Sequence, residues 1–238
     1  KDLLGRSRDL WIIDFSGLVE AEAALFEPVF AHAEEAIKSP RATNRETRTA
    51  DNWWRFRRSG EAFQKLTAPM SRFIATGLVT KHRFFVWLPR EKVLPDTRVV
   101  VIARDDDCTF GIVSSLLHEM WTLNTCQYHG VGNDPVYTTG TCFETFPFPG
   151  GLTPNIPAAD YAADPRAQAI AAAAKRLNEL RDNWLNPADL VQRVPEVVPG
   201  YPDRILPIDD KAAAVLKKRT LTNLYNERPA WLDHAHRD

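Results

Sequence analysis

Short apolar runs in the first half of the chain predict β-strands. Residues 72–76, 83–88 and 98–103 are each rich in β-branched or aromatic residues and are bounded by turn residues. Residues 9–15 (DLWIIDF) have a similar composition and predict one more short, buried strand. We therefore expect a small β-sheet.

Elsewhere, apolar residues recur at helical spacing. Between Ser16 and Pro40 they lie on one face of an amphipathic helix, in which Pro28 is expected to cause a kink. Three further helices are expected at residues 110–124, 165–185 and 209–225. Residues 186–208 are rich in proline and predict a connecting segment.

Together these elements predict an α+β fold in two domains. We expect a mixed α/β domain over residues 1–150, with a small β-sheet and flanking helices. A small helical domain is expected to follow over residues 151–238. Gly150 and Gly151 mark the expected boundary.

The formal net charge of −1 hides an uneven distribution of charge. Residues 38–104 hold 15 basic and 5 acidic side chains, a net of +10, whereas residues 1–37 and 105–238 carry −5 and −6. Such a basic block in an otherwise acidic chain is typical of proteins that bind a polyanion. A solvated basic surface without a partner accounts for the charge equally well.

The sequence lacks the motifs of several common catalytic sites. It contains no Walker loop, no Gly-x-Ser-x-Gly and no His-Glu-x-x-His, and Pro135 interrupts a Gly-x-Gly-x-x-Gly pattern. The triplet Asp105–Asp107 has ligands that suit magnesium or calcium, but a turn followed by a helix N-cap is the favoured interpretation. His82 and His118 have no local partner that would make either a general base. The pattern favours a binding module over a stand-alone enzyme.

The cysteines and the hydropathy indicate where the protein works. Cys108, Cys126 and Cys142 are widely spaced, which predicts free thiols in a reducing cytoplasm and argues against structural zinc. No apolar run approaches the roughly 18 residues of a membrane span, so no membrane partner is expected.

Six motifs in a fixed order carry a resemblance to a known family. They are WIIDF, NWWRFRR, RFIATGLVTKHRFFVWLP, VLPDTRVVVIARDDDCTFGIVSSLLHEMW, CFETFPFP and RTLTNLYNERPAWLDHAH. Over nearly its whole length the chain resembles the C-terminal part of the MmeI-like DNA methyltransferases, which include fused restriction-modification enzymes and phage-defence methylases. The resemblance implies a target recognition domain followed by a helical C-terminal domain.

The resemblance also implies what the rest of such an enzyme contains. Members of the family carry an upstream adenine-N6 methyltransferase domain with an Asn-Pro-Pro-Tyr/Phe motif and an S-adenosylmethionine site. Neither feature is in these 238 residues, which begin at Lys1 without a methionine. We therefore expect a non-catalytic part of a longer enzyme, which binds double-stranded DNA, contacts its own methyltransferase domain and has no cofactor of its own.

Three segments are implied to contact DNA bases. They lie after the first strand, at the end of the VVVIA strand and in the variable loop before the Phe-Pro-Phe-Pro motif. They hold Lys81, His82 and Arg83, then Arg104 and Asp105, then Gly132, Asn133 and Asp134. Lysine and arginine can donate to guanine O6 and N7, asparagine matches adenine, and aspartate can accept from cytosine N4. Asp105 as a helix cap and Arg83 as a phosphate contact are the alternatives for those two residues.

Phosphate contacts are expected from the basic block. The candidates are Arg45, Arg48, Arg55, Arg57, Arg58, Lys65 and Arg72. The rival hypothesis is a protein-interaction module, in which the basic block binds an acidic protein and the aromatic clusters form the interface.

Overall fold

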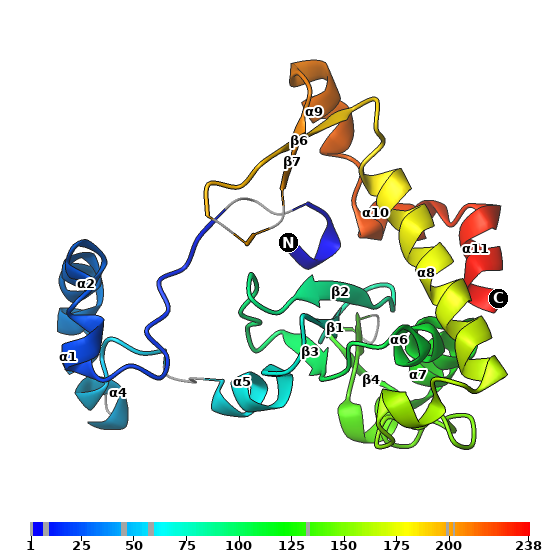
Figure 1. Cartoon of the computed structure of the whole chain (residues 1–238), viewed down its shortest axis with the longest axis horizontal. Helices are drawn as coiled ribbons and strands as arrows, with labels where there is room; N and C mark the ends of the chain where they lie inside the picture. Colours follow the sequence, from blue (N-terminus) through cyan, green and yellow to red (C-terminus); the bar gives the residue numbers. More distant parts are fainter. Residues whose placement is uncertain are drawn as a thin grey trace. The chain divides into compact units, whose positions relative to one another are not determined.

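The computed structural model describes residues 2–6, 10–43, 47–56, 60–131, 134–198, 200–201 and 203–238, without the side chains of residues 2, 47 and 48. The chain forms two compact units (Figure 1). The larger unit comprises Lys1–Ser7 and Pro69–Asp238, and the smaller unit is Arg8–Ala68. Helices and small antiparallel sheets together give the expected α+β fold.

A three-stranded antiparallel sheet lies at the centre of the larger unit. Its strands are β1 (Arg72–Gly77), β2 (Val86–Pro89) and β3 (Val99–Ile102), in the order β2-β1-β3. Ile74 of β1 pairs with Trp87 of β2 and with Ile102 of β3. The middle strand is almost wholly buried, as its apolar sequence predicts, and all three expected strands are confirmed.

Two helices follow the sheet where the sequence predicted one. Helix α6 spans Asp107–Ser114 and α7 spans Leu116–Thr125. Ser115 is extended, and its Oγ accepts from the backbone N–H of His118, so it caps α7 and ends α6. The backbone N–H of Thr109 donates to Asp106 Oδ1 at 2.8 Å, which makes Asp106 the N-cap of α6.

The long helix α8 (Pro165–Leu185) has the predicted bounds. It crosses α6 at Gly111, where a Cβ atom would lie 2.6 Å from Ile170 Cγ2 and 2.9 Å from Ile170 O. Glycine is therefore required for this close approach. The expected domain boundary at residue 150 lies inside the larger unit, because the residues on both sides of it share one core.

This core joins the sheet to the helices. Its buried side chains are Ile74, Phe85, Ile102, Phe110, Val113, Tyr137, Cys142 and Ala174. A second cluster holds Cys108, Ile112, Leu152, Tyr161 and Ala167 beside α6 and α8. Burial of these apolar side chains is the main stabilising contribution to the unit.

The remaining elements of the larger unit are short. Hairpin strands β4 (Gln127–His129) and β5 (Asp134–Val136) precede the π-helix η3 (Thr139–Phe143), and the 3-10 helices are η1 (Asp2–Leu4) and η4 (Ala158–Tyr161). Strands β6 (Val191–Val194) and β7 (Arg204–Pro207) form a hairpin in the segment expected only to connect. The helix expected at 209–225 is divided into α9 (Asp210–Leu216) and α10 (Leu221–Glu227), because the Thr220 side chain caps the start of α10. The last helix is α11 (Ala230–Arg237).

The smaller unit is helical and differs from the prediction at its start. Its elements are α1 (Glu20–Ala23), α2 (Glu27–Ala33), the π-helix η2 (Glu34–Lys38), α3 (Ser39–Ala42), α4 (Thr47–Asp51) and α5 (Glu61–Thr67). The strand predicted at residues 9–15 does not form: residues 10–15 have no regular structure and residues 10–13 are exposed. Phe15 alone of this run joins the core, with Ala23, Ala33 and Trp53.

Candidate nucleic-acid interface

Several chain segments meet at the C-terminal end of strand β1. Residues 78–82 leave the strand there, and the backbone N–H of Leu78 donates to Arg98 O at 2.8 Å, beside the start of β3. On the other side, Val79 forms a β-bridge with Val136 of the β4–β5 hairpin. We call this region the sheet end and define it as residues 78–82, Arg98, residues 127–131 and residues 134–136.

The sheet end carries exposed polar and charged side chains from residues 78–82, from Arg98 and from the β4–β5 hairpin. Lys81, Arg98, His129 and Asp134 are exposed, and His82 is half-buried. In the hairpin, His129 and Asp134 are directly paired across the two strands. Two of the three segments implied to contact bases therefore lie side by side, although Gly132 and Asn133 fall outside the described residues.

Arg83, expected to contact a base, is buried inside the protein. Its guanidinium donates to Thr76 Oγ1 at 2.9 Å, Gly77 O at 2.6 Å and Pro135 O at 3.4 Å, and the residue is only 3% exposed. Burial lowers the pKa of the guanidinium to about 10. Arg83 thus links β1 to the hairpin through hydrogen bonds, and its guanidinium is too deeply buried to contact a base.

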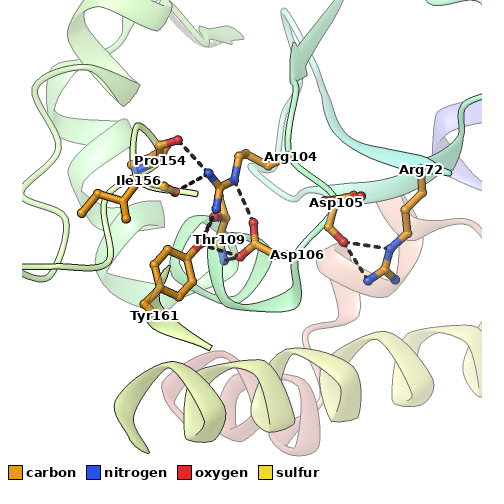
Figure 2. A network of polar contacts seen from close by, with 8 residues as sticks. All are labelled: Arg72, Arg104, Asp105, Asp106, Thr109, Pro154, Ile156 and Tyr161. Atoms are coloured by element: carbon orange, nitrogen blue, oxygen red, sulfur yellow. Dashed lines mark hydrogen bonds and ion pairs between the residues drawn. The ribbon is translucent and has the colours of Figure 1, made fainter. Parts of the chain in front are cut away.

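Arg104 also binds the protein itself (Figure 2). Its Nε donates to Asp106 Oδ2 at 2.8 Å, and its terminal nitrogens donate to Pro154 O, Ile156 O and the Tyr161 hydroxyl. The Tyr161 hydroxyl in turn donates to Asp106 Oδ1 at 3.0 Å. This network joins the N-terminus of α6 to the segment after residue 150, so it is a structural cluster.

Asp105 is exposed, but it lies at the opposite end of the sheet from Lys81. Both Nε and one terminal nitrogen of Arg72 donate to Asp105 O, at 3.2 and 3.1 Å, and Arg72 begins β1 (Figure 2). The rest of β1 extends about 17 Å from there to Gly77, at about 3.3 Å per residue. The expectation of one surface formed by all three segments is therefore corrected to two adjacent segments and one remote segment.

The arginines expected to contact phosphate are partly engaged in the fold. Arg45, Arg57 and Arg58 lie outside the described residues, as does the side chain of Arg48. Arg55 donates through Nε to Leu18 O at 2.7 Å and lies over the Trp54 ring at 5.5 Å. Lys65 is exposed on α5 and stays a candidate.

Arg72 is the last of these candidates, and it is held by three partners. Besides Asp105 O, it binds Asp107 Oδ1 at 3.0 Å and stacks on Trp87, with the guanidinium carbon 3.8 Å from the ring centroid. About a third of its side chain is exposed. A phosphate contact from Arg72 would have to use this exposed fraction.

Two buried histidines, His118 and His236, have structural partners. His118 Nδ1 lies 2.8 Å from Val113 O and its Nε2 lies 3.2 Å from the Tyr137 hydroxyl. His236 repeats this arrangement with Ser114 O at 2.5 Å and the Tyr225 hydroxyl at 2.7 Å. Because each Nδ1 faces a carbonyl, it must donate, and each Nε2 accepts from a tyrosine. Both rings therefore bind backbone carbonyl groups at the C-terminus of α6.

The sequence interpretation missed two residues of this region. Arg98 lies in a turn that the backbone hydrogen bond from Val99 N–H to Asp96 O closes, and its own backbone N–H donates to Asp96 Oδ1 at 2.6 Å. Asn226 of α10 accepts hydrogen bonds from both Lys81 and His82. Arg98 was visible as a cation beginning a predicted strand, whereas the contact of Asn226, more than 140 residues away, has no local signal.

Searches of protein-family models, curated proteins and solved structures find no match to this chain. Within the described part of the chain, no helix is both long and apolar enough to cross a membrane. The same residues contain no cluster of three or more histidine, cysteine or acidic side chains placed to hold a metal ion.

Proposed function

We propose that this protein recognises duplex DNA by sequence and that the sheet end touches the bases. In this proposal it is the recognition part of an S-adenosylmethionine-dependent adenine-N6 DNA methyltransferase of a restriction-modification or phage-defence system in the cytoplasm. The observation that carries the proposal is the juxtaposition of residues 78–82 with the β4–β5 hairpin. Both segments are implied, by the family resemblance, to contact bases.

The chemistry of the sheet end supports this assignment. Lys81 and Arg98 supply exposed donors, and Asp134 supplies an exposed acceptor. A lysine suits the O6 and N7 acceptors of guanine, and a carboxylate suits the N4 donor of cytosine. A two-stranded ribbon such as β4–β5 is also narrow enough to enter a major groove.

The proposal divides the work of the enzyme between two parts. The methyltransferase domain would bind S-adenosylmethionine and carry out the methyl transfer. The chain described here would fix one register on the duplex, so that a single target adenine is presented for flipping out of the helix. Arg83 and Arg104 are not among the proposed contacts, because both are committed inside the protein.

A salt titration tests the proposal. Affinity for a random-sequence duplex should fall linearly with salt on logarithmic axes, with a slope of about 0.9 per neutralised phosphate. Lys65→Ala, which removes the exposed phosphate candidate on α5, should weaken binding to all sequences alike and reduce the slope by about one phosphate contact. Enrichment from a randomised duplex library should then reveal a preferred site. Binding that does not change with salt concentration, or a library in which no sequence is enriched, would refute the proposed function.

One observation favours a second function, that of a protein-interaction module. In the smaller unit, Leu10, Trp11, Ile12, Leu25 and Phe26 are between 56% and 79% exposed. Exposed apolar side chains that form a contiguous patch mark protein-binding surfaces, and these five come from two short stretches of the unit, residues 10–12 and 25–26. An interface formed by these side chains would differ from the acidic-partner interface expected from charge, because apolar contacts would dominate it. Binding of a protein that survives high salt and is abolished by Trp11→Ser with Phe26→Ser would support this second function.

A further inference from the structure

Asn226 connects the C-terminal helices to the sheet end. Its Oδ1 atom lies 2.7 Å from Lys81 Nζ and 2.8 Å from His82 Nε2. An amide oxygen only accepts hydrogen bonds, so Lys81 and His82 both donate to it. One atom of α10 thus fixes two neighbouring side chains of the β1–β2 connection.

The position of Asn226 is itself fixed by its buried neighbour Tyr225. The Tyr225 ring lies 4.9 Å from Phe84 and 6.2 Å from His82, centroid to centroid. Its hydroxyl binds Arg181 at 3.2 Å and His236 at 2.7 Å. The adjacent residue Leu224 is fully buried as well. Helix α10 is therefore anchored in the core beside the very loop that Asn226 contacts.

This geometry points to Asn226 as a positioning residue for base recognition, a proposal that rests on the proposed DNA-binding function. A lysine ammonium has three N–H donors, so Lys81 keeps two after donating to Asn226. Two donors match O6 and N7 of guanine. A free lysine side chain loses much rotamer freedom on binding, and the hydrogen bond to Asn226 removes part of that cost in advance. Asn226 therefore holds the Lys81 side chain in position to bind guanine, and does not itself contact DNA.

Selection from a randomised duplex library tests this inference in the full 238-residue chain. Asn226→Ala removes the acceptor, whereas Asn226→Asp keeps an acceptor oxygen in the same place. Gln168→Ala is the matched control, because Gln168 is also an exposed amide, bound to Ala162 O at 3.0 Å away from the sheet end. Affinity for random duplex and the melting temperature are measured alongside each selection.

Asn226→Ala should lose about tenfold of the preference for guanine at one base pair, with unchanged melting temperature and random-duplex affinity. Asn226→Asp should retain that preference and bind all duplexes more weakly, since it adds a negative charge. Gln168→Ala should behave as the parent chain. An unchanged preference in Asn226→Ala, or a loss at a base other than guanine, overturns the inference and leaves the DNA-binding function intact. A parent chain that selects no sequence overturns both.

Discussion

Unfolding of the larger unit should be strongly pH-dependent because of two buried histidines. Burial lowers the pKa of both His118 and His236 to about 4, against about 6.5 for histidine in an unfolded chain. The native protein holds both rings neutral, with Nδ1 donating to Val113 O and Ser114 O. Their contribution to stability is complete above pH 6.5 and is lost as the pH falls toward 4, because the unfolded chain then binds more protons.

The size of the effect follows from these pKa values. At pH 5 an unfolded histidine is almost fully protonated and the native one is not, which costs about 2 kcal/mol per ring relative to pH 7.5. The two rings together should reduce the free energy of unfolding by about 4 kcal/mol. Asp106 and Asp233 add little in this interval, because the pKa of each carboxyl lies below its ordinary value near 4. Burial raises the pKa of Asp106, but hydrogen bonds from Thr109 and Arg104 outweigh it, and a hydrogen bond from Arg228 lowers the pKa of Asp233.

Urea denaturation followed by circular dichroism at pH 7.5 and pH 5.0 measures this loss. His236→Asn removes one titrating ring and should halve the pH-dependent loss to about 2 kcal/mol, even if it lowers stability at both pH values. His32→Asn is the control, because His32 is exposed on α2. Equal stability at the two pH values, or a full loss retained in His236→Asn, would refute the assignment of these rings as buried and neutral.

Three substitutions test the internal roles found in the larger unit. Arg83→Met should cost about 3 kcal/mol in urea denaturation, since it leaves the buried acceptors without their charged donor; an unchanged denaturation midpoint would contradict this. Arg104→Ala should cost about 2 kcal/mol by breaking its bonds to Asp106 and Tyr161, yet leave base preference in library selection unchanged; an altered preference would restore it as a base contact. Gly111→Ala should lower the melting temperature through a cost of about 1–3 kcal/mol, because its Cβ meets Ile170, and a neutral effect would show that α6 and α8 can separate freely.

Local sequence signals predicted the regular elements well where packing reinforced them. The three strands of the sheet and helix α8 appear as expected, because their apolar residues face a common core. The exceptions depend on single capping residues. The side chains of Ser115 and Thr220 each accept a hydrogen bond from a backbone N–H and so begin a new helix within a continuous apolar pattern. The spacing of apolar residues does not show where such a break occurs.

The basic block shows why charge alone did not locate a binding surface. Arg41, Arg55, Arg72, Arg83 and Arg104 all donate to backbone carbonyl groups of the protein. Whether an arginine meets a carbonyl or a phosphate depends on contacts between residues far apart in sequence. The same reason hid Asn226, whose partners lie across the fold.

Hydrogen–deuterium exchange with and without duplex DNA tests the central claim most directly. Bound duplex should slow exchange in peptides that cover residues 78–82, residues 127–136 and Arg98, which immediately precedes β3. The segment around Arg104 and Asp105, at the far end of the sheet, should exchange at the same rate in both states. Protection confined to residues 103–107, or no protection at the sheet end under conditions where DNA is bound, would contradict the account.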